Sequence, residues 1–544
     1  MDNWLLNHTG LIVALVVAAG FTVRVWAASG TFLNPDEALH FRAANQTSWK
    51  LSYQFGLAIA HPPLLIFLLH IWRLIGTSEL FLRFPSIILG SAFCWSIFKW
   101  LMTLFSRPVA LIGVSFAAFL PPMIALSAEV RQYALLLFFS ATAAYLLELA
   151  LRQNSIRKML FCVFCVYASM LSHYSGVLFA MAVGIYGLLR LLTKPSSRGM
   201  LVPWIAGQIG SVVVCAFLYF VQLSKLRANF GGVSPLQDFM GNYYLHNSYF
   251  LGRNPILFVI ARTGGVFQYV FGELVIGDLA FPIFIAGILS AMRPRAANPN
   301  TQTDVSPRLI SLLLLLPFAL NCVLALARVY PYGGTRHSAF LFMFAIAGVS
   351  LYLAKAVGSH AARGIGLALL IAALCNAFAA HHKPYIARAD QRMEHMNRAL
   401  EFIETQVAPD APIFADQQTI LLLGHYLCRE KPYVADRSLP NFTTFQCQGH
   451  KIIAPRPDNW IFDADTFPSR WNEMVRTFHP AVGQTVLVVQ AGWDIGLARQ
   501  LQNRQDFHNV NFQLLGRNVT LFKLKVGRDG GIEANAYPPY GNKV

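Results

Sequence analysis

The stretch LIVALVVAAGFTVRVWAASGTFLNPDEALHFRAANQ, residues 11–46, joins a long apolar run to two adjacent carboxylates. Its first part, residues 11–28, has Arg24 as its one charged residue and reaches the length at which a helix crosses a bilayer, roughly 20 residues. The run lacks a basic leader and a small-residue cleavage site, so we interpret it as a retained span and not as a signal peptide. Asp36 and Glu37 then stand immediately outside the first span.

The composition of the whole chain is that of a membrane protein. The 544 residues are 55% hydrophobic and 13% charged, whereas a soluble domain carries roughly a quarter charged residues. Apolar runs recur through about the first 380 positions, which predicts a polytopic helical protein. The formal net charge is +17, and the basic residues fall largely between the apolar runs. We assign this charge to membrane orientation and contact with anionic membrane lipids, and we expect no nucleic-acid partner.

The apolar runs predict about eleven membrane spans. The expected spans are residues 9–28, 85–105, 108–126, 132–151, 159–172, 175–192, 201–221, 279–292, 309–328, 338–354 and 364–380. Four loops with clustered basic residues are expected to face the cytosol. These loops are residues 152–158, 193–198, 293–308 and 355–363. An odd number of spans with the N-terminus inside places the C-terminal tail outside.

Two stretches between spans are expected to be long external loops. Residues 62–76 are apolar, but only about 14 residues long and interrupted by His70 and Arg73, so they suit an interfacial helix better than a span. Residues 29–84 therefore form one external loop with interfacial helices. A second external stretch, residues 222–262, is polar and aromatic.

The character of the chain changes near residue 385. Residues 1–384 form the transmembrane module, and residues 385–544 are expected to form a soluble α/β domain outside the cytosol. An amphipathic helix at 388–406 is followed by short strands within 411–417, 484–492 and 519–526. The domain contains Cys428 and Cys447, for which a disulfide and two free thiols remain equal alternatives. No nucleotide-binding glycine motif is present.

The carboxylates near the first span have a purely structural interpretation. Asn34 stands where a helix N-cap belongs, Pro35 occupies the first helical position, and Glu37 completes an approximate capping box. Asp36 and Glu37 would then satisfy amide groups at the helix start and interact with the helix dipole. For an isolated helix this interpretation is the favoured one.

The predicted topology collects other ionisable residues on the same side of the membrane. They are His61, Arg83, Glu129, Arg131, His173, Tyr174, Arg336 and His337. Each residue alone has an ordinary structural explanation. Glu129 and Arg131 can form an ion pair, and His173 can be a histidine in a turn whose ring nitrogens are hydrogen-bonded. Charged groups at the edge of an apolar bundle are costly, however, so several of them on one side predict a functional site.

Carboxylates and cations together suit glycosyl transfer from a lipid phosphate. A sugar phosphate leaves readily when arginine side chains stabilise the departing phosphate. An ionised carboxylate can accept the proton of the attacking hydroxyl, and attack opposite the phosphate inverts the anomeric carbon. Such a donor also suits a compartment without nucleotide sugars.

Several motifs together resemble the GT-C glycosyltransferases. They are the Asp36-Glu37 pair, HPP at 61–63, RFPS at 83–86, EVRQYAL at 129–135 and YPYGGTRH at 330–337. The resemblance is to the bacterial branch related to protein O-mannosyltransferases, aminoarabinose transferases and Rhizobium lipopolysaccharide galacturonosyltransferases. It covers roughly residues 10–380.

The resemblance implies a role for each matching residue. Asp36 would be the catalytic base, with Glu37 in support. Arg336 and His337 would meet the donor phosphate, with Arg83 nearby. The pocket-shaping residues would be His61, Glu129, Arg131, His173 and Tyr174. The resemblance also implies a polyprenyl-phosphate sugar donor and a periplasmic C-terminal domain over the active site. No cofactor is expected, and no motif indicates a metal, although Glu129 or His173 is available as a ligand.

We therefore expect an inverting glycosyltransferase of the bacterial inner membrane that acts at the periplasmic face. Its acceptor would be an envelope lipid, lipopolysaccharide or polysaccharide, with a protein the less favoured choice. The main alternative is a transporter or flippase of a lipid-linked glycan. A transporter should carry charged or broken helices near the bilayer midplane, whereas these ionisable residues cluster at one face. A membrane-anchored binding protein would leave that cluster unexplained.

Overall fold

The computed structural model describes most of the 544 residues. Outside the described residues lie 1, 60, 194–198, 226–239, 246–253, 273–274, 293–304, 359, 383–390, 429–435, 437, 457–461, 494–495, 505–506, 508–509, 517, 529–531 and 534–544. The chain forms two compact units. Unit 1 comprises Met1–Ala28, Trp49–Trp72 and Leu80–Ala387, and unit 2 comprises Ser29–Ser48, Arg73–Glu79 and Arg388–Val544.

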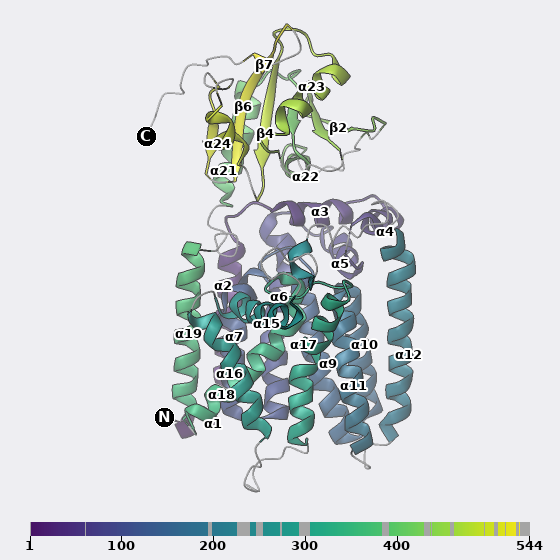
Figure 1. Ribbon diagram of the computed structural model, residues 1–544, viewed down its shortest axis with the longest axis vertical. Coiled ribbons are helices and arrows are strands. Elements are labelled where there is room, and N and C mark those ends of the chain that lie inside the picture. Colours follow the sequence, from purple (N-terminus) through teal and green to yellow (C-terminus); the bar gives the residue numbers. More distant parts are fainter. Residues whose placement is uncertain are drawn as a thin grey trace. The chain divides into compact units, whose positions relative to one another are not determined.

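Unit 1 is a bundle of helices (Figure 1). Its longer helices are α2 (Thr9–Ala28), α6 (Glu79–Leu104), α7 (Arg107–Phe119), α9 (Tyr133–Gln153), α10 (Ile156–Ser172), α11 (Ser175–Thr193), α12 (Leu201–Phe217), α15 (Pro255–Phe271), α16 (Val275–Met292), α17 (Pro307–Leu326), α18 (Phe342–Ala356) and α19 (Ala361–His382). The shorter pieces are α1 (Asp2–Asn7), α4 (Trp49–Ala58), α5 (Leu64–Trp72), α8 (Pro121–Ala125), the π-helix η2 (Leu218–Leu223) and the 3-10 helices η3 (Gly241–Tyr243) and η5 (Arg336–Leu341).

The polytopic architecture predicted from the sequence is confirmed, with fewer full-length spans. Within the described residues, 9 helices are long and apolar enough to cross a membrane, and each corresponds to a predicted span. The other two predicted spans, 108–126 and 159–172, are the shorter helices α7, with 13 residues, and α10, with 17. Helix α7 ends early because Pro121 and Pro122, which have no amide hydrogen, follow it.

Arg24, the one charge in the first span, is buried because it completes the end of α7. The carbonyl groups of Ala117 and Ala118 would normally accept hydrogen bonds from residues 121 and 122, which are both proline. The guanidinium group of Arg24 donates to them instead, over 2.8 Å to Ala117 and 3.0 Å to Ala118. This contact fixes α2 against the bundle and accounts for a charge inside a span.

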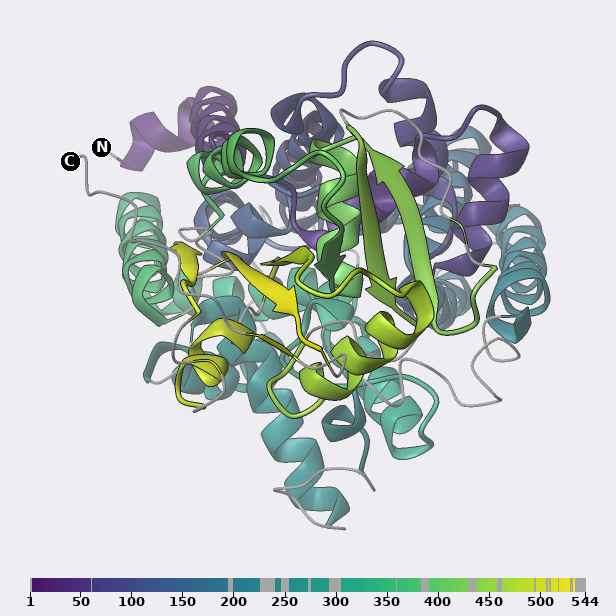
Figure 2. The ribbon, with the colours of Figure 1, turned by 90° about the horizontal axis from the view of Figure 1, so that it is seen from above.

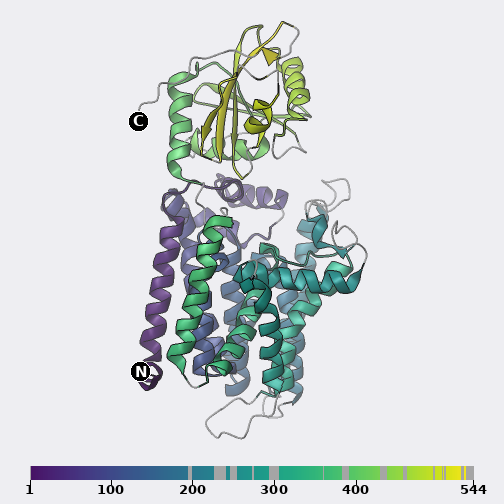
Figure 3. The same cartoon turned by 60° about the vertical axis from the view of Figure 1, so that its left-hand side comes forward.

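The predicted external stretches contain helices that are not spans. Helix α5 has 9 residues, so the segment 62–76 is too short to cross a membrane, as expected. The stretch 222–262 lies partly outside the described residues, but its last part begins helix α15, which the sequence did not predict. Asn254 caps this helix by accepting hydrogen bonds from the amides of Ile256 and Leu257. Helix α15 lies across the neighbouring helices in two views (Figures 1 and 3).

Unit 2 contains a mixed β-sheet with helices, as predicted for the C-terminal region. The strands are β1 (Ile413–Ala415), β2 (Phe442–Cys447), β3 (His450–Pro455), β4 (Thr485–Ala491), β5 (Gln513–Leu515), β6 (Val519–Val526) and β7 (Ile532–Glu533). Their order is β2-β3-β1-β4-β6-β5, and β7 pairs with β6. Strand β1 runs parallel to β3 and β4, and the other pairs are antiparallel (Figure 2).

The predicted strands 411–417, 484–492 and 519–526 contain β1, β4 and β6, and the predicted helix 388–406 contains α21 (Met393–Gln406). The β2–β3 hairpin was not predicted. The other helices of unit 2 are α3 (Pro35–Ala44), α22 (Gln417–Tyr426), α23 (Phe467–Phe478) and α24 (Leu497–Gln502). Aromatic and aliphatic side chains of β1, β4, β6 and α23 form the core, with Trp471 fully buried.

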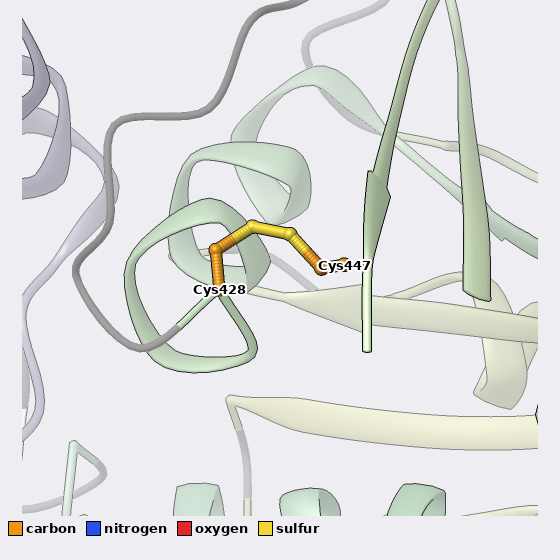
Figure 4. Close-up of a disulfide and its surroundings, with 2 residues drawn as sticks. All are labelled: Cys428 and Cys447. Carbon is orange, nitrogen blue, oxygen red and sulfur yellow. A yellow bond between two sulfur atoms is a disulfide. The ribbon is translucent and has the colours of Figure 1, made fainter. Parts of the chain in front are cut away.

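Cys428 and Cys447 form a disulfide, which decides between the two alternatives that the sequence left open (Figure 4). Cys428 stands just beyond the end of α22, and Cys447 is the last residue of β2. The bond closes a sequence separation of 19 residues. A loop of this length typically stabilises a folded domain by about 3 kcal/mol through the entropy that the unfolded chain loses.

Candidate functional site

The two carboxylates after the first span have different environments in unit 2. The Oδ1 atom of Asn34 accepts a hydrogen bond from the Glu37 amide over 2.9 Å, and the Glu37 Oε2 atom accepts one from the Asn34 amide over 2.8 Å. This is a full capping box, and the Glu37 side chain is completely buried. The Asp36 side chain is half-buried. The structural interpretation therefore applies to Glu37, and Asp36 is the carboxylate of the pair that solvent reaches.

Three histidines predicted as site residues come together within unit 1. The ring centroids of His61 and His173 are 6.4 Å apart, and those of His173 and His337 are 5.8 Å apart. His61 lies between α4 and α5, His173 between α10 and α11, and His337 in the first turn of η5. Connections that lie far apart in the sequence thus meet at one place.

Two arginines add positive charge to this place. Arg131 and Arg336, together with His337, act electrostatically on His173. Burial lowers the pKa of His173 well below its usual value, and the positive charges of His337, Arg131 and Arg336 lower it further. His173 is therefore neutral at neutral pH. We call His61, Arg131, His173, Arg336 and His337 the cationic cluster.

Three residues that the sequence did not indicate contact the cationic cluster. The Gln132 amide nitrogen lies 3.0 Å from Nδ1 of His61, and the Ser175 hydroxyl lies 2.8 Å from Nδ1 of His173. The Gln222 amide on the π-helix η2 donates to the carbonyl of His61. Gln132 directly follows the predicted Arg131, and Ser175 directly follows the predicted Tyr174, so their positions in the sequence could have indicated them. Gln222 carried no such signal, although π-helices often occur at functional sites.

Tyrosine side chains border the cationic cluster. The Tyr133 ring lies 5.2 Å from the His173 ring, and the Arg131 guanidinium lies over it at 5.6 Å. The Tyr330 hydroxyl donates to the carbonyl of His337 over 3.1 Å. The buried hydroxyl groups of Tyr133 and Tyr174 have no hydrogen-bond partner within the described part of the chain.

The remaining predicted residues of unit 1 are Arg83, near the start of α6, and Glu129, in the connection between α8 and α9. Arg83 is fully buried in the first turns of α6 and donates to the carbonyl of Ala28 over 2.8 Å. Ser86, three residues further along α6, donates to the carbonyl of Arg131 over 3.3 Å. Glu129 is half-buried, and its carbonyl accepts the Arg131 amide over 2.8 Å. Among the described residues, no three His, Cys, Asp or Glu side chains are grouped as a metal site.

The loop that carries Arg336 and His337 is fixed against α15. The hydroxyls of Tyr332 and Thr263 are 2.7 Å apart, and the Tyr332 amide donates to the Tyr243 carbonyl over 3.1 Å. A β-carbon on Gly334 would stand 2.3 Å from the carbonyl oxygen of Gly265, so the two backbones approach as closely as glycine allows. Helix α15 therefore sets the path of the chain into η5.

Replacing Gly334 by alanine should displace this loop and, with it, Arg336, which the sequence predicts to bind the donor phosphate. The new methyl group meets backbone atoms of Gly265, which cannot rotate away. If Arg336 meets the phosphate of the polyprenyl donor that the sequence predicts, a displacement of about 1 Å there is expected to raise the dissociation constant for a polyprenyl phosphate roughly 10- to 100-fold. Binding to the purified protein is the measurement. Gly264→Ala is the matched control, because a β-carbon there has nothing within 4 Å, and it should bind normally. Equal affinity of Gly334→Ala and wild type would contradict the positioning role of this contact.

The chain is similar to known proteins in one sequence segment and in its fold. Residues 60–220 match the family model described as dolichyl-phosphate-mannose-protein mannosyltransferase. No curated protein sequence matches the chain. ArnT from Cupriavidus metallidurans, solved with bound undecaprenyl phosphate, has 14% identity and a TM-score of 0.50, over 94% of this chain and 97% of that chain. The apo oligosaccharyltransferase of Archaeoglobus fulgidus has 14% identity and a TM-score of 0.46, over 88% of this chain and 69% of that chain.

The likeness to ArnT shows that the two chains share a fold. The matched segment 60–220 contains His61, Arg83, Glu129, Arg131, His173 and Tyr174. The chain is therefore a polytopic helical membrane protein that shares its fold with ArnT and is similar to the dolichyl-phosphate-mannose-protein mannosyltransferase family through residues 60–220.

Proposed function

We propose that this protein is a GT-C glycosyltransferase that moves a sugar from a polyprenyl-phosphate donor to an acceptor of the bacterial envelope, with inversion at the anomeric carbon. The observation that carries the proposal is the cationic cluster, in which His173 lies beside His337 and the positive charges of His337, Arg131 and Arg336 act on it. The matching family model is described by a donor of this class, dolichyl-phosphate mannose. ArnT, which has the same fold, was solved with undecaprenyl phosphate.

The cationic cluster suits the departing phosphate of such a donor. When the bond between the anomeric carbon and the phosphate oxygen breaks, the oxygen keeps the electron pair and the lipid phosphate gains negative charge. Arginine side chains can bind phosphate through two parallel hydrogen bonds, and their charge stabilises the leaving group. We assign this role to Arg336 and His337, with Arg131 and Arg83 contributing positive charge. His61 and Tyr174 would shape the pocket.

Asp36 is the proposed general base. It would accept the proton of the acceptor hydroxyl as that oxygen attacks the anomeric carbon opposite the phosphate. The half-buried position of Asp36 and the capping role of Glu37 support this choice within the pair. Glu37 would then support the base by fixing the first turn of α3. Glu129 would shape the pocket and is not needed as a second base.

We place the reaction at the periplasmic face of the inner membrane. The disulfide between Cys428 and Cys447 supports an oxidising compartment for unit 2, because structural disulfides are rare in the cytosol. The proposed acceptors are lipids, lipopolysaccharide or polysaccharide of the envelope, with protein as the less favoured class.

The test is a comparison of envelope lipids and glycans from cells with and without this protein. Mass spectrometry should find one sugar missing from one acceptor in the deletion strain, together with accumulation of its polyprenyl-phosphate donor. Purified protein in detergent should restore that sugar to the extracted acceptor. A flippase of a lipid-linked glycan requires a bilayer, so restoration in detergent distinguishes the enzyme from that alternative. Unchanged glycans in the deletion strain would contradict the proposal.

A further inference from the structure

The segment that leads into α3, the helix of Asp36, is paired with residues far along the chain. Phe32 donates its amide hydrogen to the carbonyl of Gln391 over 2.9 Å, and the Met393 amide donates to the carbonyl of Gly30 over 2.8 Å. Thr31 and Arg392 form an antiparallel β-bridge between these two bonds. The entry to α3 is thus tied to the start of α21 within unit 2.

The next residue of this segment is held by α22. The hydroxyl oxygen of Tyr426, the last residue of α22, accepts a hydrogen bond from the amide of Leu33 over 2.7 Å. Leu33 is fully buried and directly precedes Asn34, the N-cap of α3. Two turns further along α3, the Phe41 ring packs edge-on against His425 of α22, with centroids 5.0 Å apart. Helix α22 therefore contacts α3 near its start and along its length.

Helix α22 is itself fixed at both ends. At its start, the buried Asp416 side chain accepts hydrogen bonds from the Thr419 amide over 2.9 Å and the Phe462 amide over 3.2 Å. Beyond its end, the disulfide joins Cys428 to the last residue of β2. Movement of α22 would break these contacts, so the helix transmits the position of the sheet to α3.

The loop after β4 supports the first turn of α3 directly. Gly492 has a φ of +141°, and a β-carbon on it would stand 3.0 Å from Cγ of Pro35. The amide of the next residue, Trp493, donates to the Gln418 side chain of α22 over 3.3 Å. Pro35, the residue before Asp36, therefore lies against a loop that is also bonded to α22.

We propose that Tyr426 is a positioning residue for Asp36, and that the C-terminal domain sets the geometry of the general base. This inference depends on the proposed role of Asp36. A base acts only when its oxygen lies within hydrogen-bond reach of the proton that it removes, and small displacements are costly. The hydrogen bond from Leu33 to Tyr426 fixes the backbone three residues before Asp36. Its loss should slow the chemical step and leave binding of the lipid phosphate unchanged.

The test compares Tyr426→Phe with wild type in the full chain, in detergent. The labelled donor and the acceptor for the activity assay are both extracted from the envelope of the deletion strain. Bare undecaprenyl phosphate is the probe for the binding assay. We expect kcat to fall roughly fivefold to twentyfold, as one buried amide loses its partner, with an unchanged dissociation constant for undecaprenyl phosphate. Hydrogen exchange should quicken in residues 29–34 and remain as in wild type in strands β4 and β6. Reduction of the Cys428–Cys447 disulfide in the wild-type protein should also lower kcat.

Thr520→Val is the matched control in the same unit. The buried Thr520 hydroxyl on β6 has no hydrogen-bond partner within the described part of the chain, so its removal should leave kcat unchanged. Normal kcat in Tyr426→Phe, beside an inactive Asp36→Asn, would overturn this inference and leave the proposed function intact. An equal loss of phosphate affinity in Tyr426→Phe would also overturn it, because the effect would then be general. An active Asp36→Asn protein would overturn the base assignment, and this inference with it.

Discussion

Asp36→Asn is expected to lower kcat for sugar transfer by about 10²- to 10⁴-fold, the range that a general base contributes. Asparagine has nearly the shape of aspartate but cannot accept the proton of the acceptor hydroxyl. The substitution lies outside the capping box that Asn34 and Glu37 form, so α3 should keep its structure. The measurement is the transfer rate of the purified protein at saturating donor, together with its affinity for undecaprenyl phosphate, which should not change.

Glu37→Gln is the matched control for this prediction. It changes the neighbouring carboxylate to an amide, which can still accept a hydrogen bond from the Asn34 amide and thus keep the capping box. We expect its kcat to remain within roughly threefold of wild type, because a neutral capping group is only slightly weaker than a charged one. If the two variants lose activity equally, the assignment of one base within the pair is wrong.

Arg336→Ala is expected to weaken binding of undecaprenyl phosphate roughly 10- to 100-fold, as when a charged hydrogen bond is removed from a partly buried site. Arg336 is half-buried at the start of η5, and its charge reaches His173 in the cationic cluster. Arg336→Lys should recover part of the affinity, because lysine keeps the charge but cannot form two parallel hydrogen bonds with phosphate. Equilibrium binding to the purified variants is the measurement.

The control for Arg336→Ala is an arginine of the preceding loop. Arg328 is exposed and stands eight residues earlier in the sequence, so Arg328→Ala removes the same charge from the same loop. Its affinity for undecaprenyl phosphate should stay within about twofold of wild type, since exposed charges contribute little. Equal losses in the two variants would show that the effect comes from general charge and not from a bound phosphate.

The sequence predicted the fold most accurately where local signals were strong. Long and strongly apolar runs, such as residues 309–328, correspond to full helices, and the strand predicted at 519–526 is β6. Helix α15 was missed because Arg262, Gly264 and Gly265 interrupt its apolar pattern. The β2–β3 hairpin was missed because Gln448 and Gly449 form its turn, with φ values of 51° and 89°, and glutamine-glycine is a weak signal for such a turn.

The candidate site was predicted as a set of residues but not as a geometry. His61, His173 and His337 were identified from motifs, and the structure brings them together. Their order in space depends on which helix ends meet, which no local pattern encodes. The different environments of Asp36 and Glu37 follow from one hydrogen-bond pair with Asn34. The contact between Leu33 and Tyr426 joins residues 393 positions apart, so only the folded chain reveals it.

The most direct test of this account is to map where the phosphate of a polyprenyl donor binds. Undecaprenyl phosphate that carries a photoreactive group beside the phosphate would be bound to the purified protein, irradiated, and the labelled peptides identified by mass spectrometry. We expect labelling of the peptides that contain the cationic cluster residues Arg131, His173 and Arg336, and a strong decrease of that labelling in Arg336→Ala. Labelling confined to other parts of the chain, or unaffected by the Arg336 substitution, would contradict the account.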